Sequence, residues 1–125
     1  MDDLPVLEVM YPGYWLGCFE EIQMAMSLNK PLAIDVSHLY IQLNAGVITQ
    51  EQINRIYDYH KVSEIHVSSN NGKRDNHMPI DQSTYGLDWS RERAKDGIPV
   101  VLECYMHKLS HEQRTQQINL LKKER

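Results

Sequence analysis

The sequence predicts an α/β fold made of four consecutive βα units whose strands are parallel. Two observations lead to this prediction. Short apolar runs recur four times along the 125 residues, and segments with helical patterning separate and follow them. Alternation of this kind is typical of right-handed βαβ units around a parallel sheet.

The four apolar runs have the character of buried strands. They are short and aliphatic, and they do not alternate cleanly between apolar and polar residues. Strands of a parallel sheet have this composition because both of their faces are covered. The predicted strands are Leu4–Met10, Pro31–Val36, Val62–Val67 and Ile98–Cys104.

The helical segments are predicted from apolar spacing and from start signals. Two of them open with a capping box, in which a Ser or Thr precedes a Gln by three residues. A third is amphipathic, and a fourth is short and polar and ends before a glycine. They are Cys18–Asn29, a helix opening at Thr49, Asp88–Lys95 and a helix opening at Ser110.

Composition and charge narrow the classes of function. The length fits one domain over residues 1–125. The formal net charge of −4 supplies no basic surface, so nucleic acid is not favoured as a partner. No apolar run reaches the roughly 20 residues of a membrane span, and the acidic N-terminus differs from a signal peptide. Cys18 and Cys104 form no disulfide framework, and we expect a cytoplasmic protein.

Each predicted strand ends in a side chain that can bind a metal ion. A single acidic residue at a strand end is more often a solvated residue or a helix cap. Four in four parallel strands favour a shared site, because the C-terminal ends of parallel strands meet at one edge. Mixed carboxylate and imidazole ligands suit a divalent ion such as Mn, Fe or Zn. The four residues are Glu8, Asp35, His66 and Glu103.

Two further pairs add candidate ligands. Asp35 is followed three residues later by His38, which can face the same mouth. Asp75 and His77 lie in the long irregular segment Ser68–Leu87, where alternate residues of an extended chain share a side. A loop of this length inside a compact domain is usually functional or mobile. With these residues the candidate ligands number more than one ion can use.

These motifs resemble the C-terminal half of the xylose isomerase-like TIM-barrel superfamily. The resemblance runs from Pro5–Val9 to Val100–Glu103 and the last helix, and its most characteristic pieces are Ala33–Leu39 and Glu64–Ser68. The superfamily includes sugar isomerases and epimerases, endonuclease IV and multinuclear iron oxidative enzymes. The resemblance therefore implies a (βα)4 half-barrel over residues 1–125.

The resemblance also implies roles for individual residues. The four strand-end residues fall where the isomerases and epimerases hold one divalent cation. His38 falls where those enzymes contact substrate and where endonuclease IV has another metal ligand. Asp75 and His77 match the D-x-H that endonuclease IV-like members use for an additional metal. Members with several metals take two more histidines from the first half of the barrel, and this chain lacks that half.

Three functions follow as alternatives. The first is a metal-dependent isomerase or epimerase acting on a small carbonyl or polyol substrate, with Glu8 and Glu103 as the catalytic pair that moves a proton. The second is a multinuclear site for phosphoester hydrolysis or oxidative chemistry. The third is a non-catalytic metal-binding or assembly protein.

An open half-barrel leaves sheet edges and one sheet face uncovered, which invites pairing. We therefore expect either a homo-oligomer or a separate chain that supplies the other half-barrel. A second copy would bring eight carboxylates of Glu8, Asp35, Asp75 and Glu103 into one mouth, and these would need protons or cations as compensation.

Overall fold

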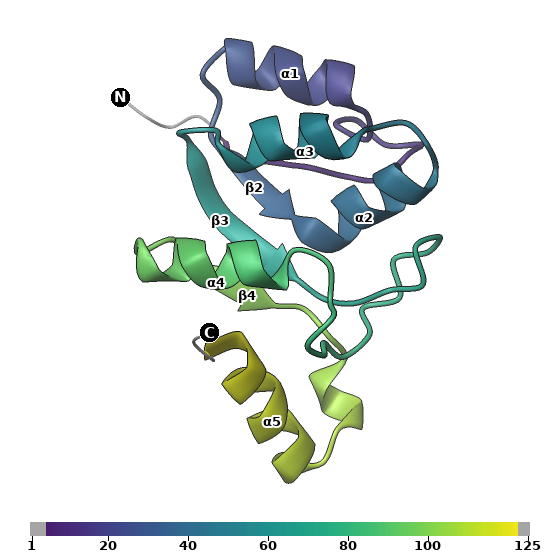
Figure 1. Ribbon diagram of the computed structural model, residues 1–125, viewed down its shortest axis with the longest axis vertical. Coiled ribbons are helices and arrows are strands. Elements are labelled where there is room, and N and C mark those ends of the chain that lie inside the picture. The colour runs from purple at the N-terminus through teal and green to yellow at the C-terminus, as the bar shows by residue number, and fades with distance from the viewer. Residues whose placement is uncertain (1–4, 123–125) are drawn as a thin grey trace.

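The computed structural model describes residues 5–122, which form a four-stranded sheet with helices along it (Figure 1). All neighbouring strands pair in parallel, in the order β1-β2-β3-β4, and the sheet does not close into a barrel. The predicted α/β fold with four parallel strands is therefore confirmed. The strands are β1 (Leu7–Glu8), β2 (Leu32–Asp35), β3 (Val62–Val67) and β4 (Val100–Leu102).

The observed strands differ from the predicted runs mainly at the sheet edges. The central strand β3 has the predicted bounds, whereas β1 and β4 are much shorter than their apolar runs. Both are edge strands with one partner each, so part of each apolar run has no neighbouring strand with which to form a regular series of backbone hydrogen bonds. Single backbone hydrogen bonds still extend the pairing, from Val9 N to Ala33 O and from Glu103 N to Val67 O. Leu4, the predicted start of the first strand, lies outside the described residues.

Four of the helices follow the predictions. The Thr49 capping box is present with both of its reciprocal bonds, and Ser110 and Gln113 make the corresponding pair of bonds. These helices are α1 (Phe19–Ser27), α3 (Gln50–Tyr57), α4 (Leu87–Lys95) and α5 (His111–Lys122), and a short 3-10 helix covers Met106–Lys108.

One helix was not predicted. Helix α2 (Val36–Asn44) begins directly at the end of β2, where the sequence predicts that the strand continues through Val36. The first residue of the helix is β-branched and continues the apolar run, so the change of structure is hidden in the pattern. The cause of the change is the N-cap Asp35, whose side chain accepts hydrogen bonds from the amides of Ser37 and His38.

The pleat of the sheet separates an apolar face from a polar face. Leu32, Ile34 and Ile65 are fully buried and pack with the core residues of the helices. Burial of one such side chain stabilises the fold by about 1.5–3 kcal/mol. Residues at the alternate positions point to the opposite face, and there Val101 is 40% exposed. In Figure 1, α3 and α4 lie in front of the sheet, so the helices cover the apolar face.

Polar contacts attach the last helix, which lies at the opposite end of the molecule from α1 (Figure 1). The buried Gln117 side chain accepts a hydrogen bond from Ile80 N and donates one to Ile80 O. The buried Arg91 guanidinium donates to the carbonyl of Leu120. Among the described helices none is long and apolar enough to cross a membrane.

Candidate metal centre

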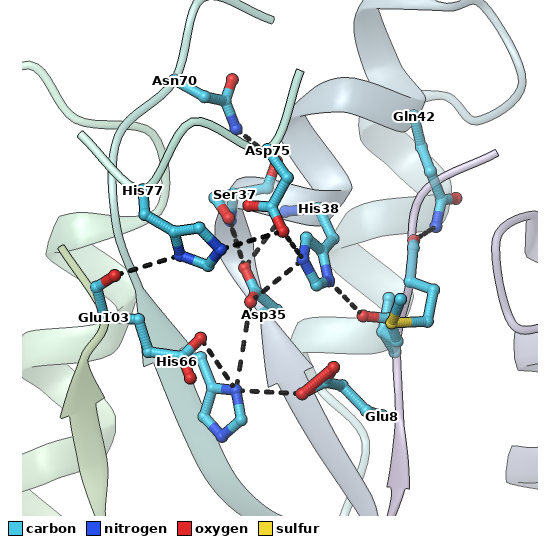
Figure 2. Close-up of polar contacts among 12 residues, drawn as sticks. Glu8, Asp35, Ser37, His38, Gln42, His66, Asn70, Asp75, His77 and Glu103 are labelled. Atoms are coloured by element: carbon cyan, nitrogen blue, oxygen red, sulfur yellow. Dashed lines mark hydrogen bonds and ion pairs between the residues drawn. The ribbon is translucent and has the colours of Figure 1, made fainter. Parts of the chain in front are cut away.

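Four acidic and histidine side chains meet at the C-terminal edge of the sheet. Asp35 ends β2 and lies in register with His66 of β3. Glu8 ends β1, and Glu103 follows β4 while its amide still bonds to the neighbouring strand. Because the strands are parallel, this register brings all four side chains to one place, as Figure 2 shows.

The ring of His66 lies at the centre of this group. Its Nδ1 is 3.2 Å from Glu8 Oε1, 3.4 Å from Glu103 Oε1 and 4.0 Å from Asp35 Oδ2. Asp35, His66 and Glu103 each offer one ligand atom, and these atoms all lie within 4.8 Å of one another. Glu8 touches the imidazole but does not belong to this compact set.

The His66 nitrogen that faces the carboxylates lacks a hydrogen bond. The residue is 9% exposed and Nδ1 itself is buried, yet this nitrogen has no hydrogen-bond partner among the described residues. Buried polar atoms nearly always make a hydrogen bond, so a buried nitrogen that makes none requires an explanation. An ion held between this nitrogen and the nearby carboxylate oxygens would supply the missing partner.

The two carboxylate oxygens of Asp35 have different partners. Oδ1 accepts from the amides of Ser37 at 3.0 Å and His38 at 3.1 Å, and also from the Ser37 hydroxyl at 2.5 Å. Oδ2 faces the histidines and lies 3.3 Å from His38 Nε2. One oxygen therefore starts helix α2, while the other stays available to a ligand.

A second cluster adjoins the first. Asp75 Oδ2 lies 3.0 Å from His38 Nε2 and 3.3 Å from His77 Nε2. The Nδ1 atoms of both histidines lie at hydrogen-bond distance from backbone carbonyls, 2.7 Å from Val9 O and 3.0 Å from Glu103 O. When Nδ1–H donates to a carbonyl, the lone pair of Nε2 points at the carboxylate side, as in histidines that bind metals.

The surroundings change the pKa values of two residues of the site. Burial lowers the pKa of His38, but the Asp35 charge, the Val9 carbonyl and the Asp75 carboxylate outweigh it, so the pKa is raised overall. Burial also raises the pKa of Glu103; the neighbouring Asp35 and Glu8 raise it further, against the opposing effect of His66 and His77. Removal of positive charge from this site therefore favours protonation of Glu103.

One residue beside the candidate metal centre was not predicted from the sequence. Glu64 Oε1 lies 3.3 Å from Nε2 of His66, on the side of the ring away from the other carboxylates. The residue stands two positions before His66 in β3, and residues two apart share a face of a strand. The spacing of two from His66 is therefore the sequence signal for Glu64, which is not a strand-end residue.

The structure brings all seven predicted site residues into one region. Asp35, His66 and Glu103 form the compact set, and Glu8 touches it through His66. His38, Asp75 and His77 form the adjoining cluster, which His38 joins to Asp35. The fold and the site define an open parallel α/β protein with a candidate metal centre. The chain matches no known protein-family model, no curated protein and no solved structure.

Proposed function

We propose that the protein binds a divalent metal ion through Asp35, His66 and Glu103, with Glu8 as a further oxygen ligand. The observation that carries the proposal is the buried Nδ1 of His66, which makes no hydrogen bond within the described residues although oxygens of three carboxylates lie within 4.0 Å of it. One imidazole with several carboxylates fits Mn, Fe or Zn better than a metal that selects thiolates.

The bound ion would serve proton transfer on a small carbonyl or polyol substrate. It would polarise a carbonyl and a neighbouring hydroxyl. Glu8 and Glu103 come from opposite edge strands, β1 and β4, so they flank the site and can exchange a proton with a substrate carbon. The resemblance to xylose isomerase-like enzymes supports this reaction class.

Metal counting tests the proposal directly. Elemental analysis first counts the ions that the purified protein retains. The protein is then stripped with a chelator and titrated with Zn²⁺ and Mn²⁺ by calorimetry. We expect one tightly held ion, and Glu103→Gln should lose it. The matched control is Glu112→Gln in α5, which removes the same charge from an exposed surface position. Wild-type protein that retains no ion would refute the proposal and favour a non-catalytic role.

The reaction class has a separate test. Substrates with a carbonyl next to a hydroxylated carbon are incubated with the metal-loaded protein in deuterium oxide. Exchange of the carbon-bound hydrogen, followed by NMR, should occur with wild-type protein and disappear with Glu103→Gln. Because the same variant is expected to lose the ion, exchange that persists in it would show that Glu103 is needed neither to hold the metal nor to move the proton.

A second candidate function uses the adjoining cluster. His38, Asp75 and His77 direct two imidazole nitrogens and one carboxylate oxygen towards each other, beside Asp35. A second ion there would make a multinuclear centre for phosphoester hydrolysis or oxidative chemistry. Two or more ions per chain, with one lost in His77→Ala, would favour this function over the isomerase.

We also propose that another chain covers the polar face of the sheet. The candidate centre lies on this face, and both edge strands have a free edge. Four further βα units, from a second copy or from a different chain, would cover the open side of the metal centre and form the remaining wall of the pocket through which a substrate reaches it. This arrangement would exclude water from the site.

A further inference from the structure

The imidazole of His66 lies between two sets of carboxylates. Its Nδ1 faces Glu8, Asp35 and Glu103, whereas its Nε2 lies 3.3 Å from Glu64 Oε1. Glu64 is the only one of these acids that stands on the same strand as His66. Both ring nitrogens therefore meet carboxylate oxygen, but on opposite edges of the ring.

Glu64 is not placed to be a ligand of the same ion. An ion bound to Nδ1 lies in line with the lone pair of that nitrogen, which points away from Nε2. Glu64 is absent from the compact set of ligand atoms formed by Asp35, His66 and Glu103 within the described residues. Its side chain is also 40% exposed, so it keeps access to solvent.

We propose that Glu64 is a positioning residue for the metal centre. Its carboxylate accepts a hydrogen bond from Nε2–H of His66, so that the unprotonated Nδ1 and its lone pair face the ion. The inference rests on the proposed metal site and adds to it the residue that selects the tautomer and ring orientation of His66. Carboxylates that hold the second nitrogen of a ligating histidine typically contribute 10–100-fold to metal affinity.

The experiment compares two substitutions at Glu64 with a charge-matched control. Zn²⁺ affinity is measured by competition with a chromophoric chelator for wild type, Glu64→Ala, Glu64→Gln and Glu112→Ala. We expect Glu64→Ala to bind roughly 10–100-fold more weakly than wild type. Glu64→Gln should lose less, because its amide oxygen still accepts from Nε2–H. Glu112→Ala removes one negative charge from an exposed helix position and should match wild type.

A second readout separates positioning from a general effect on folding or charge. In zinc-loaded wild type, ¹⁵N NMR of the His66 ring should report a protonated Nε2 and a metal-bound Nδ1. Zinc on Nδ1 by itself requires the proton on Nε2, so the role of Glu64 is measured without metal. In metal-free Glu64→Ala the ring should sample the other tautomer or orientation more than in metal-free wild type, while circular dichroism verifies that the fold persists.

The outcomes separate the two proposals. Wild-type protein without zinc affinity overturns the metal site and this inference with it. Wild-type binding with Glu64→Ala equal to Glu112→Ala, or with an unchanged His66 tautomer, overturns the role of Glu64 alone. Equal losses in Glu64→Ala and Glu64→Gln would also overturn it, since they would assign the effect to charge.

Discussion

At the scale of single residues, Asp35 contributes to both the fold and the site. Its Oδ1 holds the first turn of α2 and its Oδ2 faces His38 and His66. The residue is 1% exposed, so neither oxygen is satisfied by bulk solvent. A substitution that keeps one oxygen and changes the other separates these roles.

The first prediction concerns Asp35→Asn. Asn is as good an N-cap as Asp, so the side-chain oxygen should still start α2. At a pH above the folded pKa of His38, where that ring is neutral and gains nothing from the Asp35 charge, the melting temperature of the metal-free protein should change little. The amide nitrogen replaces the oxygen that faces the metal, and zinc binding should fall below detection in calorimetry. Asp35→Ala should lose both the helix cap and zinc binding, and loss of the cap alone should lower the free energy of unfolding by about 1 kcal/mol. Retained zinc binding in Asp35→Asn would contradict the assignment of Oδ2.

The second prediction concerns the pH dependence of stability at His38. The pKa of His38 in the folded, metal-free protein is raised, which means that protonation of this ring stabilises the folded protein relative to the unfolded chain. This stabilisation is complete below the unfolded pKa of about 6.5 and is lost as the pH rises through the folded pKa. Urea unfolding should show that the advantage of wild type over His38→Gln shrinks with rising pH. His111→Gln, at the exposed start of α5, is the control, and parallel profiles for the two variants would contradict the prediction.

The candidate ligands were predictable because they obey simple positional rules. A polar side chain at the end of each apolar run led to Glu8, Asp35, His66 and Glu103, and the D-x-H pattern led to Asp75 and His77. The sequence could not predict which of them form the compact set, because this depends on rotamers and on strand register. It also could not predict that the carbonyls of Val9 and Glu103 lie beside the two histidine rings, since these contacts join segments distant in sequence.

At the scale of secondary-structure elements, start signals in the sequence were more informative than apolar runs. The capping boxes at Thr49 and Ser110 located the starts of α3 and α5. Helix α2 was not predicted because, for Asp35, a shared metal site was favoured over the alternative of a helix cap. The strand lengths at the edges were overestimated, because an apolar run does not reveal whether a neighbouring strand is present to pair with it.

The third prediction tests the capping box of α3. Thr49→Ala removes the oxygen that accepts from Gln52 N at 3.1 Å. Loss of an N-cap of this kind costs about 1 kcal/mol, which should appear as a lower urea midpoint. Thr49 is exposed and its hydrogen bonds are to the first turn of its own helix, so zinc affinity should not change. A metal affinity that falls together with stability would contradict this separation.

The fourth prediction concerns the turn before α4. Gly86 has φ of 78°, and a Cβ there would lie 2.5 Å from Cβ of Val36 at the start of α2. Gly86→Ala therefore combines backbone strain with a steric overlap inside the core, and we expect a loss of more than about 2 kcal/mol. Gly97→Ala is the matched control. It has φ of 89° and open space around its Cβ position, so it should lose only about 1 kcal/mol. Equal losses in urea unfolding would show that the overlap is relieved without cost.

At the scale of the whole molecule, the sheet has a free edge on each side within residues 5–122. Apolar side chains are exposed beside the free edge of β1, in a groove lined by Leu7, Trp15, Met24, Ala25 and Leu28 together with the charged Glu20, Glu21 and Lys30. Trp15 is 63% exposed and Met24 is 65% exposed. Adjacent exposed apolar residues next to an unpaired strand edge favour association with another chain.

The fifth prediction is that the purified protein associates. Native mass spectrometry should detect a dimer or a complex with a different chain, and Met24→Lys should shift the population towards monomer by placing a charge in the groove. Glu112→Lys introduces the same charge on α5 and is the control. A wild-type monomer at micromolar concentration would contradict the prediction.

The double role of Asp35 has a consequence for the thermodynamics of ion capture. Because the helix cap already fixes its side chain, this ligand is preorganised, and the metal need not restrict its rotation. Glu8 and Glu103 are 40% and 33% exposed and carry no such restraint, so their ordering sets the entropic cost of binding. The same backbone that starts a helix therefore prepares one side of the coordination sphere before an ion arrives.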